Sequence, residues 1–488
     1  TERPFQAINR HINPVLGWGW ALASLTANMV WALPQYSLAS GVVQQNLLPN
    51  VLGADSSVGD FQGKVIIAVA ILVITTLITF TYDSGGWGIK AYELLLKLVV
   101  AGIVACFFGV VVVVWWKGTL DWGAIFAGFI PDLSKVYQPA EGFNWLLDAV
   151  PAAYRETWSR RDVMISAAAT AVGINMTFLL PYSMLRRGWD KSFRGLATFD
   201  LSTGMFIPFV LATSCVIIAS ATQFHPDMEK EAAWIQAEST VELPAVPEAK
   251  VQGLMTARLK AKLGDDVFAQ LGPQQVEAQL EPLTRAELLL AWHLQRKDAF
   301  DLAKSLSPLT GDTVANVVFG IGVVGMTLSS ITLLMLISGF VICEILGLPP
   351  TGWPNRLGTL AAATGVLGPF LWSGEARFWL AVPTSVFCFT LLPFAYLTFL
   401  FAMNSKSLLG DEMPRGSRRL AWNLGMGVAA SVATLAAVYM VWVKMQDAFL
   451  QRTGWPYGGY VGLGLVGAVV LLIVYVHFAY PRRPEAGD

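Results

Sequence analysis

The sequence predicts an all-α polytopic membrane protein, and three observations lead to that fold class. Hydrophobic residues make up 55% of the 488 positions and charged residues only 14%, whereas a soluble domain carries about 25% charged residues. The mean hydropathy is +0.54. The 18 Trp and 25 Pro residues fit interfacial aromatic side chains and interrupted membrane helices. We therefore expect the lipid bilayer to surround most of the chain.

Apolar stretches long enough to cross a bilayer recur along the whole sequence. In the first, Pro34 and Gln35 interrupt an apolar run that resumes to about residue 49, and the sixth is long enough to tilt. The ten expected spans are roughly 15–36, 64–82, 92–116, 163–185, 197–221, 313–345, 357–373, 378–403, 420–443 and 458–480.

The loops predict the orientation of these spans. Basic residues dominate the loops 186–194 and 406–419, and the tail after the tenth span begins with Arg482 and Arg483. Such loops lie on the cytoplasmic side of a membrane. Because all three follow even-numbered spans, they share one side. We expect a multi-pass protein of the cell inner (plasma) membrane with a cytoplasmic C-terminus.

The loop between the fifth and sixth spans differs from the others and suggests a division into 1–221, 222–312 and 313–488. Residues 222–312 hold 14 acidic against nine basic residues, a formal charge of −5, which predicts an extracytoplasmic position. The segment 282–306 has helical apolar spacing, so we expect a helical cap over the outer mouth. A solvated spacer without function is the alternative. The apolar positions are Leu288, Trp292, Ala299, Leu302 and Leu306.

Several function classes are excluded by what the sequence lacks. It contains no phosphate-binding, dinucleotide-binding or zinc-protease motif and no nucleophile elbow, so we expect no enzyme and no cofactor. The formal net charge of −1 argues against a nucleic-acid partner. The four cysteines have no metal-ligand spacing, and no obligate protein partner is evident.

The fourth span, 163–185, carries polar residues and helix breakers near its middle. Gly173 permits unwinding, and the ring of Pro181 opposes the carbonyl of Thr177. Carbonyls around 173–177, with the Asn175 amide oxygen and the Thr177 hydroxyl, could coordinate a cation, as broken helices do in many secondary transporters. A merely kinked helix, whose polar groups bond to neighbouring helices, is an equally good interpretation of the pattern alone.

Motifs in the sixth and eighth spans resemble the natural resistance-associated macrophage protein (NRAMP) family of divalent metal transporters. Residues 325–330, GMTLSS, and the pair Cys343-Glu344 occupy the places of the family's G-Q-S-S-T and M-E-G. The stretch 392–395, LPFA, and the loop 404–410, NSKSLLG, fit as well. Their order and spacing match over roughly a hundred residues.

The resemblance implies a LeuT-like inverted-repeat transporter fold in which the ten spans are family helices 3–12. We expect the chain to be a fragment whose first two family helices are missing. The fourth span becomes the broken sixth helix, so the metal would bind at Asn175, Met176 and Thr177, with Gly173 permitting the break. Gly325 and Leu391 are expected to pack close to the site, where Leu391 replaces a glutamine common in the family.

The chain departs from the family at the metal motif itself. Aligned without a gap, Asn175-Met176-Thr177 replaces M-P-H, so an amide stands for the thioether and favours a hard ion such as Mg²⁺. We prefer this alignment, which makes the protein a divergent, magnesium-type relative. A one-residue gap would restore Met176 as a thioether ligand for Mn²⁺ or Fe²⁺. The sequence leaves open which of the two residues faces the ion.

The proton path of the family is also altered. Pro34 and Ser37 stand where the family has a D-x-x-E pair, and Thr177 and Tyr182 replace the histidines of the sixth helix. Because membrane proton relays need Asp, Glu or His, we expect divalent-cation transport with weak or no proton coupling. Two alternatives remain: a transporter of another solute, such as an amino acid, on the same fold, and a non-transporting membrane sensor or scaffold.

Overall fold

Every regular element in the described part of the chain is a helix. The computed structural model describes residues 3–81, 87–118, 120–130, 132, 134, 143–148, 161–171, 173–224, 228–236, 248–263, 265–280, 284–294, 299–307, 311–371 and 380–449. The chain divides into two compact units, one of residues 1–103, 165–210 and 316–488 and the other of residues 104–164 and 211–315. The candidate site lies in the first unit.

The longer helices follow the expected membrane spans. They are α2 (Pro14–Val42), α4 (Asp60–Thr81), α5 (Trp87–Trp116), α8 (Arg161–Ala171), α9 (Ile174–Arg186), α10 (Arg194–Leu201), α11 (Ile207–Phe224), α19 (Asp312–Ile345), α22 (Ala381–Ala402) and α24 (Gly416–Phe449). Shorter elements of the first unit are α1 (Pro4–His11), η1 (Val43–Leu47), α3 (Pro49–Leu52), η6 (Lys191–Phe193), η7 (Ser202–Phe206), α20 (Gly352–Thr359), η9 (Leu360–Leu367), α21 (Gly368–Leu371), α23 (Lys406–Leu409) and η11 (Gly410–Glu412).

Six helical segments of the described residues are long and apolar enough to cross a membrane. They are Asp60–Thr81, Val163–Leu185, Lys191–Thr222, Val314–Ile345, Ala381–Ala402 and Gly416–Met445, which match six of the expected spans. The outer face of α24 illustrates their environment, because Leu420, Leu424 and Leu435 are each about two-thirds exposed or more. Apolar side chains exposed at helical spacing on one face indicate contact with lipid.

The other four expected spans, the first, third, seventh and tenth, are not among these six segments. The first and third correspond to α2 and α5. The seventh is not one regular helix, because its middle, η9, is a 3₁₀ segment between α20 and α21. The tenth, 458–480, lies outside the described residues.

Helix α2 is continuous through Pro34, where the apolar run of the sequence is interrupted. Pro34 lies inside the helix and is buried. A proline leaves the carbonyl four residues earlier without its helical partner, but packing on both sides maintains the helix. Gly368 of α21 approaches so closely that an added Cβ would lie 1.9 Å from the Leu33 carbonyl oxygen. Only a glycine allows this contact.

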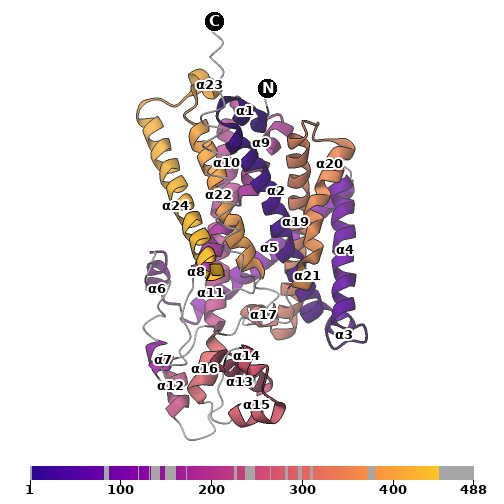
Figure 1. The fold of residues 1–488 in the computed structure, drawn as a ribbon, viewed down its shortest axis with the longest axis vertical. Helices are drawn as coiled ribbons and strands as arrows, with labels where there is room; N and C mark the ends of the chain where they lie inside the picture. The colour runs from indigo at the N-terminus through magenta and orange to yellow at the C-terminus, as the bar shows by residue number, and fades with distance from the viewer. Residues whose placement is uncertain are drawn as a thin grey trace. The chain divides into compact units, whose positions relative to one another are not determined.

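Helix α2 is the central element of the first unit. It packs against α22, η9, α9 and α4, and Figure 1 shows it among these helices, with α24 running beside α22. The buried residues Trp20, Ala27, Ile174 and Cys388 belong to one hydrophobic cluster that joins α2, α9 and α22. The break between α8 and α9 therefore faces a helix that is buried over most of its length.

The second unit contains short helices with their own core. They are α6 (Trp122–Ala127), α7 (Asn144–Asp148), α12 (Met228–Gln236), α13 (Glu248–Leu263), α14 (Asp265–Phe268), α15 (Pro273–Leu280), α16 (Arg285–Leu294), α17 (Ala299–Ala303) and η8 (Lys304–Leu306). Within the segment 282–306 the structure describes α16, α17 and the 3₁₀ turn η8, while residues 295–298 lie outside the described residues. Helix α16 starts with a capping box. Thr284 N donates to Glu287 Oε2 at 3.1 Å, and Glu287 N donates to Thr284 Oγ1 at 3.2 Å.

Candidate metal site at the broken helix

The fourth span is interrupted where the sequence suggested. Helix α8 ends at Ala171 and α9 begins at Ile174. Gly173 caps α9 with extended backbone, φ −82° and ψ 141°. A Cβ added to Gly173 would lie 2.4 Å from the Asn175 amide oxygen. The backbone angles suit any residue, but a side chain at position 173 would displace the Asn175 amide from its present position.

The unwound stretch is shorter than expected. Residues 174–177, whose carbonyls were expected to be released, form the first turn of α9. Gly173 O accepts a hydrogen bond from Met176 N at 3.0 Å. The first amides of a helix and the last carbonyls of the preceding one lack helical partners. The Gly173 and Ile174 carbonyls have partners, whereas the Thr177 carbonyl is opposite Pro181, which has no N–H to donate to it.

Asn175 lies at the break and is buried, with 6% of its surface exposed. Its Oδ1 accepts a hydrogen bond from Met176 N at 3.0 Å. An amide oxygen has a second lone pair, so this contact leaves one acceptor direction for a cation. Asn175 is thus the predicted ligand whose position best fits a metal site.

Met176 and Thr177 are placed differently from Asn175. Met176 is 43% exposed, while its neighbours Ile174 and Phe178 are buried in the cluster that joins α9 to α2. The Thr177 hydroxyl is occupied, because it accepts from Trp20 Nε1 at 2.9 Å and donates to the Ile174 carbonyl. These contacts hold α9 against α2.

Two residues of α2 that contact this turn were not predicted from the sequence. Trp20 and Ser24 are fully buried. Trp20 donates to Thr177, and Ser24 Oγ lies 3.5 Å from the Ile174 carbonyl oxygen. Residues four apart lie on one face of a helix. The spacing of the polar groups of Trp20 and Ser24 could therefore have indicated from the sequence that this face contacts another helix.

The two residues expected beside the site have different positions. Leu391 packs against the hydrophobic cluster that contains Ile174 and so lies in the same helix group as the break. Gly325 is buried in α19, but the α19 residues of this cluster begin at Ile337. At 1.5 Å per residue, Gly325 is roughly 18 Å further along the helix axis.

Charged side chains are scarce near the break. No group of three or more His, Cys, Asp or Glu residues that could hold a metal occurs in the described residues. The described part of the first unit has two buried charged residues, Lys64 and Glu344. Lys64 pairs with Asp60 at 2.6 Å. The other, Glu344, accepts from Arg3 Nη1 at 3.0 Å. The donors at the break are therefore neutral oxygens.

The segment before α2 is bound to the far end of α9 and α19. Arg3 also donates to the Leu348 carbonyl at 3.0 Å, and Phe5 N donates to the Tyr182 hydroxyl at 3.2 Å. The Glu344 side chain in this group has no exposed surface, whereas that of Arg3 is one-third exposed. This ion pair closes one end of the helix group that contains the break.

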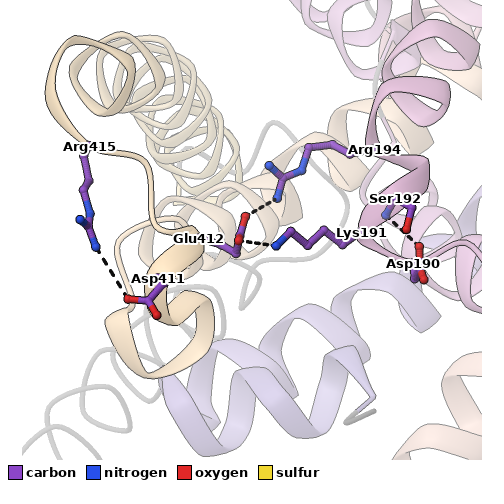
Figure 2. Close-up of polar contacts among 7 residues, drawn as sticks. All are labelled: Asp190, Lys191, Ser192, Arg194, Asp411, Glu412 and Arg415. Atoms are coloured by element: carbon purple, nitrogen blue, oxygen red, sulfur yellow. Dashed lines mark hydrogen bonds and ion pairs between the residues drawn. The ribbon is translucent and has the colours of Figure 1, made fainter.

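Two loops predicted to share one side of the membrane meet in the structure (Figure 2). Lys191 pairs with Glu412, and Arg194 Nη2 lies 3.9 Å from the same carboxylate. Asp190 accepts from Ser192 N at 2.8 Å and caps the turn that presents Lys191. The hydrogen bonds with Ser192 lower the pKa of Asp190. These contacts confirm that the loops after the fourth and eighth expected spans lie on the same side of the first unit.

A chain whose described regular elements are all helices, six of them long and apolar enough to cross a membrane, has the architecture of a polytopic membrane protein. The family profile described as natural resistance-associated macrophage protein-like matches residues 6–244 and 283–443. The chain therefore belongs to the NRAMP family, whose members are integral membrane transporters of divalent metal cations. No curated protein matches the chain. The profile passes over residues 245–282, which fall inside the acidic loop.

Proposed function

We propose that the chain transports a hard divalent cation, Mg²⁺ in preference to Mn²⁺ or Fe²⁺, through the break between α8 and α9. The observation that carries this proposal is the Asn175 amide, buried at the break with one oxygen lone pair still available. Amide and carbonyl oxygens are the ligands that hard ions prefer, whereas soft thioethers favour transition metals.

The position of Met176 supports the same choice of ion. Its side chain is 43% exposed, while Asn175 is 6% exposed. A thioether ligand would have to leave its present position and enter the buried side of α9. We therefore favour Asn175 over Met176 as the residue that meets the ion, with Gly173 allowing the approach of the amide and Thr177 fixing the turn.

Transport is proposed to be weakly coupled to protons or not coupled at all. Lys64 and Glu344 are the buried charged residues in the described part of the first unit, and each forms an ion pair. Proton relays across membranes need titratable groups in sequence. The hydroxyl and amide groups of α2 and α9 do not titrate in the physiological range.

The proposed setting is the plasma membrane, with the loops that contain Lys191 and Glu412 in the cytoplasm. The excess of Lys and Arg in 186–194 and 406–419 supports this orientation. The acidic segment 222–312 would then lie outside, and the C-terminus would be cytoplasmic.

Uptake by reconstituted vesicles tests the proposal. The full chain is placed in liposomes that contain a Mg²⁺-sensitive dye, and Asn175→Ala is compared with Asn144→Ala, which changes an exposed asparagine of α7. We expect Asn175→Ala to reduce the initial rate by at least about tenfold, the effect of losing about 1.4 kcal/mol of binding. Equal rates in the two variants would remove Asn175 from the site.

Transport of an amino acid is the second candidate. The N-terminus of α9 opens into the break at Gly173, and helix N-termini favour carboxylates and other anions. Stabilisation of the purified protein by amino acids, without stabilisation by Mg²⁺ or Mn²⁺, would favour this candidate over the cation.

A further inference from the structure

The face of α2 that meets α9 continues beyond the two contacts described above. Trp20 contacts Thr177, and Ser24 contacts the Ile174 carbonyl. As the residue number on α2 rises by four, the partner number on α9 falls by three, so the two helices run in opposite directions. The next position on this face is Asn28. Its level along the axis is that of the break at Gly173.

Asn28 is a buried polar residue, and both ends of its amide lack a hydrogen-bond partner in the described structure. Its side chain is fully buried. Neither Oδ1 nor Nδ2 has a hydrogen-bond partner among the residues that the structure describes. Buried amides are almost always hydrogen-bonded, so an amide with both ends unpartnered indicates that another molecule supplies the partner.

The neighbours of Asn28 define the chemistry of that partner. The Ala27 carbonyl on the same helix accepts from Cys388 Sγ at 3.9 Å, so α22 closes one side. The Ser24 hydroxyl lies one turn earlier on the same face of α2, where it meets the first residue of α9. These groups and the Asn28 amide are neutral oxygen donors, and the Asn28 Nδ2 is a donor for an ordered water. Such a set suits a cation that keeps part of its water shell.

We propose that Asn28 is a second ligand for the transported cation, opposite Asn175, and that the ion is held between α2 and the break in α9. This inference rests on the proposed function and adds a helix to the site. Asn28 Oδ1 binds the ion directly or through one water, while Asn175 Oδ1 binds it from the α9 side. Because both ligands are uncharged, the ion retains waters and can leave again.

The test uses Asn28→Leu in the full-length protein, with Ser40→Ala as the matched control. Ser40 is also fully buried on α2 with an unpartnered hydroxyl, but it is 12 residues, or roughly 18 Å, further along the axis. Replacing an unpartnered amide by an apolar group of similar size is neutral or stabilising for folding. A loss of function in Asn28→Leu would therefore not reflect unfolding.

The readout is the thermal midpoint of the purified protein as a function of Mg²⁺ concentration, followed by uptake into vesicles. We expect Asn28→Leu to keep or raise the midpoint without Mg²⁺ and to raise the half-saturating Mg²⁺ concentration by at least about tenfold. Ser40→Ala should keep the wild-type response. Asn28→Asp should lower the half-saturating concentration, because a carboxylate adds charge opposite the ion.

The outcomes separate this inference from the proposed function. If the wild type and Asn28→Leu respond to Mg²⁺ alike while Asn175→Ala does not respond, Asn28 is satisfied by water alone and the inference is overturned, but the proposed function stands. If the wild type itself shows neither stabilisation nor uptake with any divalent cation, both are overturned.

Discussion

Helices α2 and α19 of the first unit both carry buried polar side chains, but they satisfy them in different ways. In α19, Thr327, Thr332 and Ser338 donate to carbonyl oxygens three or four residues earlier in the same helix at 2.8–2.9 Å. In α2, Trp20 and Ser24 reach across to α9, and Asn28 has no partner in the described structure.

The difference teaches how to separate a structural polar residue from a functional one in a membrane helix. A hydroxyl can bond back to its own helix, so its presence requires no external partner. An amide on a helix face has a donor and an acceptor in fixed positions and needs a neighbour or a ligand. Thr327, Thr332 and Ser338 of α19 therefore bond within their own helix, whereas Trp20, Ser24 and Asn28 lie on the face of α2 that meets the start of α9.

The largest expected effect comes from filling the space at the break. Gly173→Ala places a Cβ 2.4 Å from the Asn175 amide oxygen, so the amide must move away while the helices remain. We expect the uptake rate to fall by at least about tenfold, with a small change in the thermal midpoint. Gly195→Ala is the control, because a Cβ there meets nothing within 4 Å. Wild-type uptake by Gly173→Ala would show that the Asn175 position is unimportant.

A second expected effect concerns the C-terminal end of α19, where Glu344 pairs with a residue from outside the helix. Arg3→Ala removes the cation from the fully buried Glu344 carboxylate. Leaving a buried carboxylate unpaired should lower the free energy of unfolding by about 2–3 kcal/mol, measured by denaturant titration in mixed micelles. Adding Glu344→Gln to Arg3→Ala should restore part of the loss, since it removes the unpaired charge. A double variant no more stable than Arg3→Ala would contradict the ion-pair explanation.

A smaller effect is expected where a polar side chain of α19 is hydrogen-bonded within its own helix. Ser338→Ala removes a hydroxyl whose hydrogen bond goes to the Leu334 carbonyl of its own helix. We expect a change in the free energy of unfolding within about 0.5 kcal/mol and an unchanged response to Mg²⁺. If Ser338→Ala weakened the Mg²⁺ response as much as Asn28→Leu, the distinction between the two helices would fail.

The smallest effect is expected at the loop contact of Figure 2, which involves neither α2 nor α19. The Lys191 hydrogen bond, followed by its charge and that of Arg194, lowers the pKa of Glu412. Since the pKa is lower in the folded protein, the contact stabilises above the ordinary Glu pKa and is lost as pH falls through the lowered value. Both side chains are largely exposed, so the effect is small. The thermal midpoints of wild type and Lys191→Ala should differ slightly at neutral pH and converge in acid; a constant difference would contradict this explanation.

Much of the fold could be predicted because it depends on local composition. Apolar length identified the spans that became α4, α19, α22 and α24, and Gly173 marked the break in the fourth. The family resemblance drawn from GMTLSS and LPFA is confirmed by the profile match.

The remaining details depend on tertiary contacts. Pro34 does not interrupt α2, because α21 and η9 pack against the helix there. Asn28 was missed because its lack of a partner is visible only once α2, α9 and α22 are packed together. That α9 restarts as early as Ile174, so that residues 174–177 form its first turn, is likewise not set by the sequence pattern. Gly325 was expected beside the site from the resemblance, but it lies further along α19.

Simultaneous recording of Mg²⁺ uptake and internal pH in vesicles containing the full chain tests the central claim most directly. A site of neutral oxygens from Asn28 and Asn175 predicts saturable Mg²⁺ uptake that leaves the internal pH unchanged when the membrane potential is clamped. Uptake of Mn²⁺ in preference to Mg²⁺, accompanied by acidification of the interior, would contradict it.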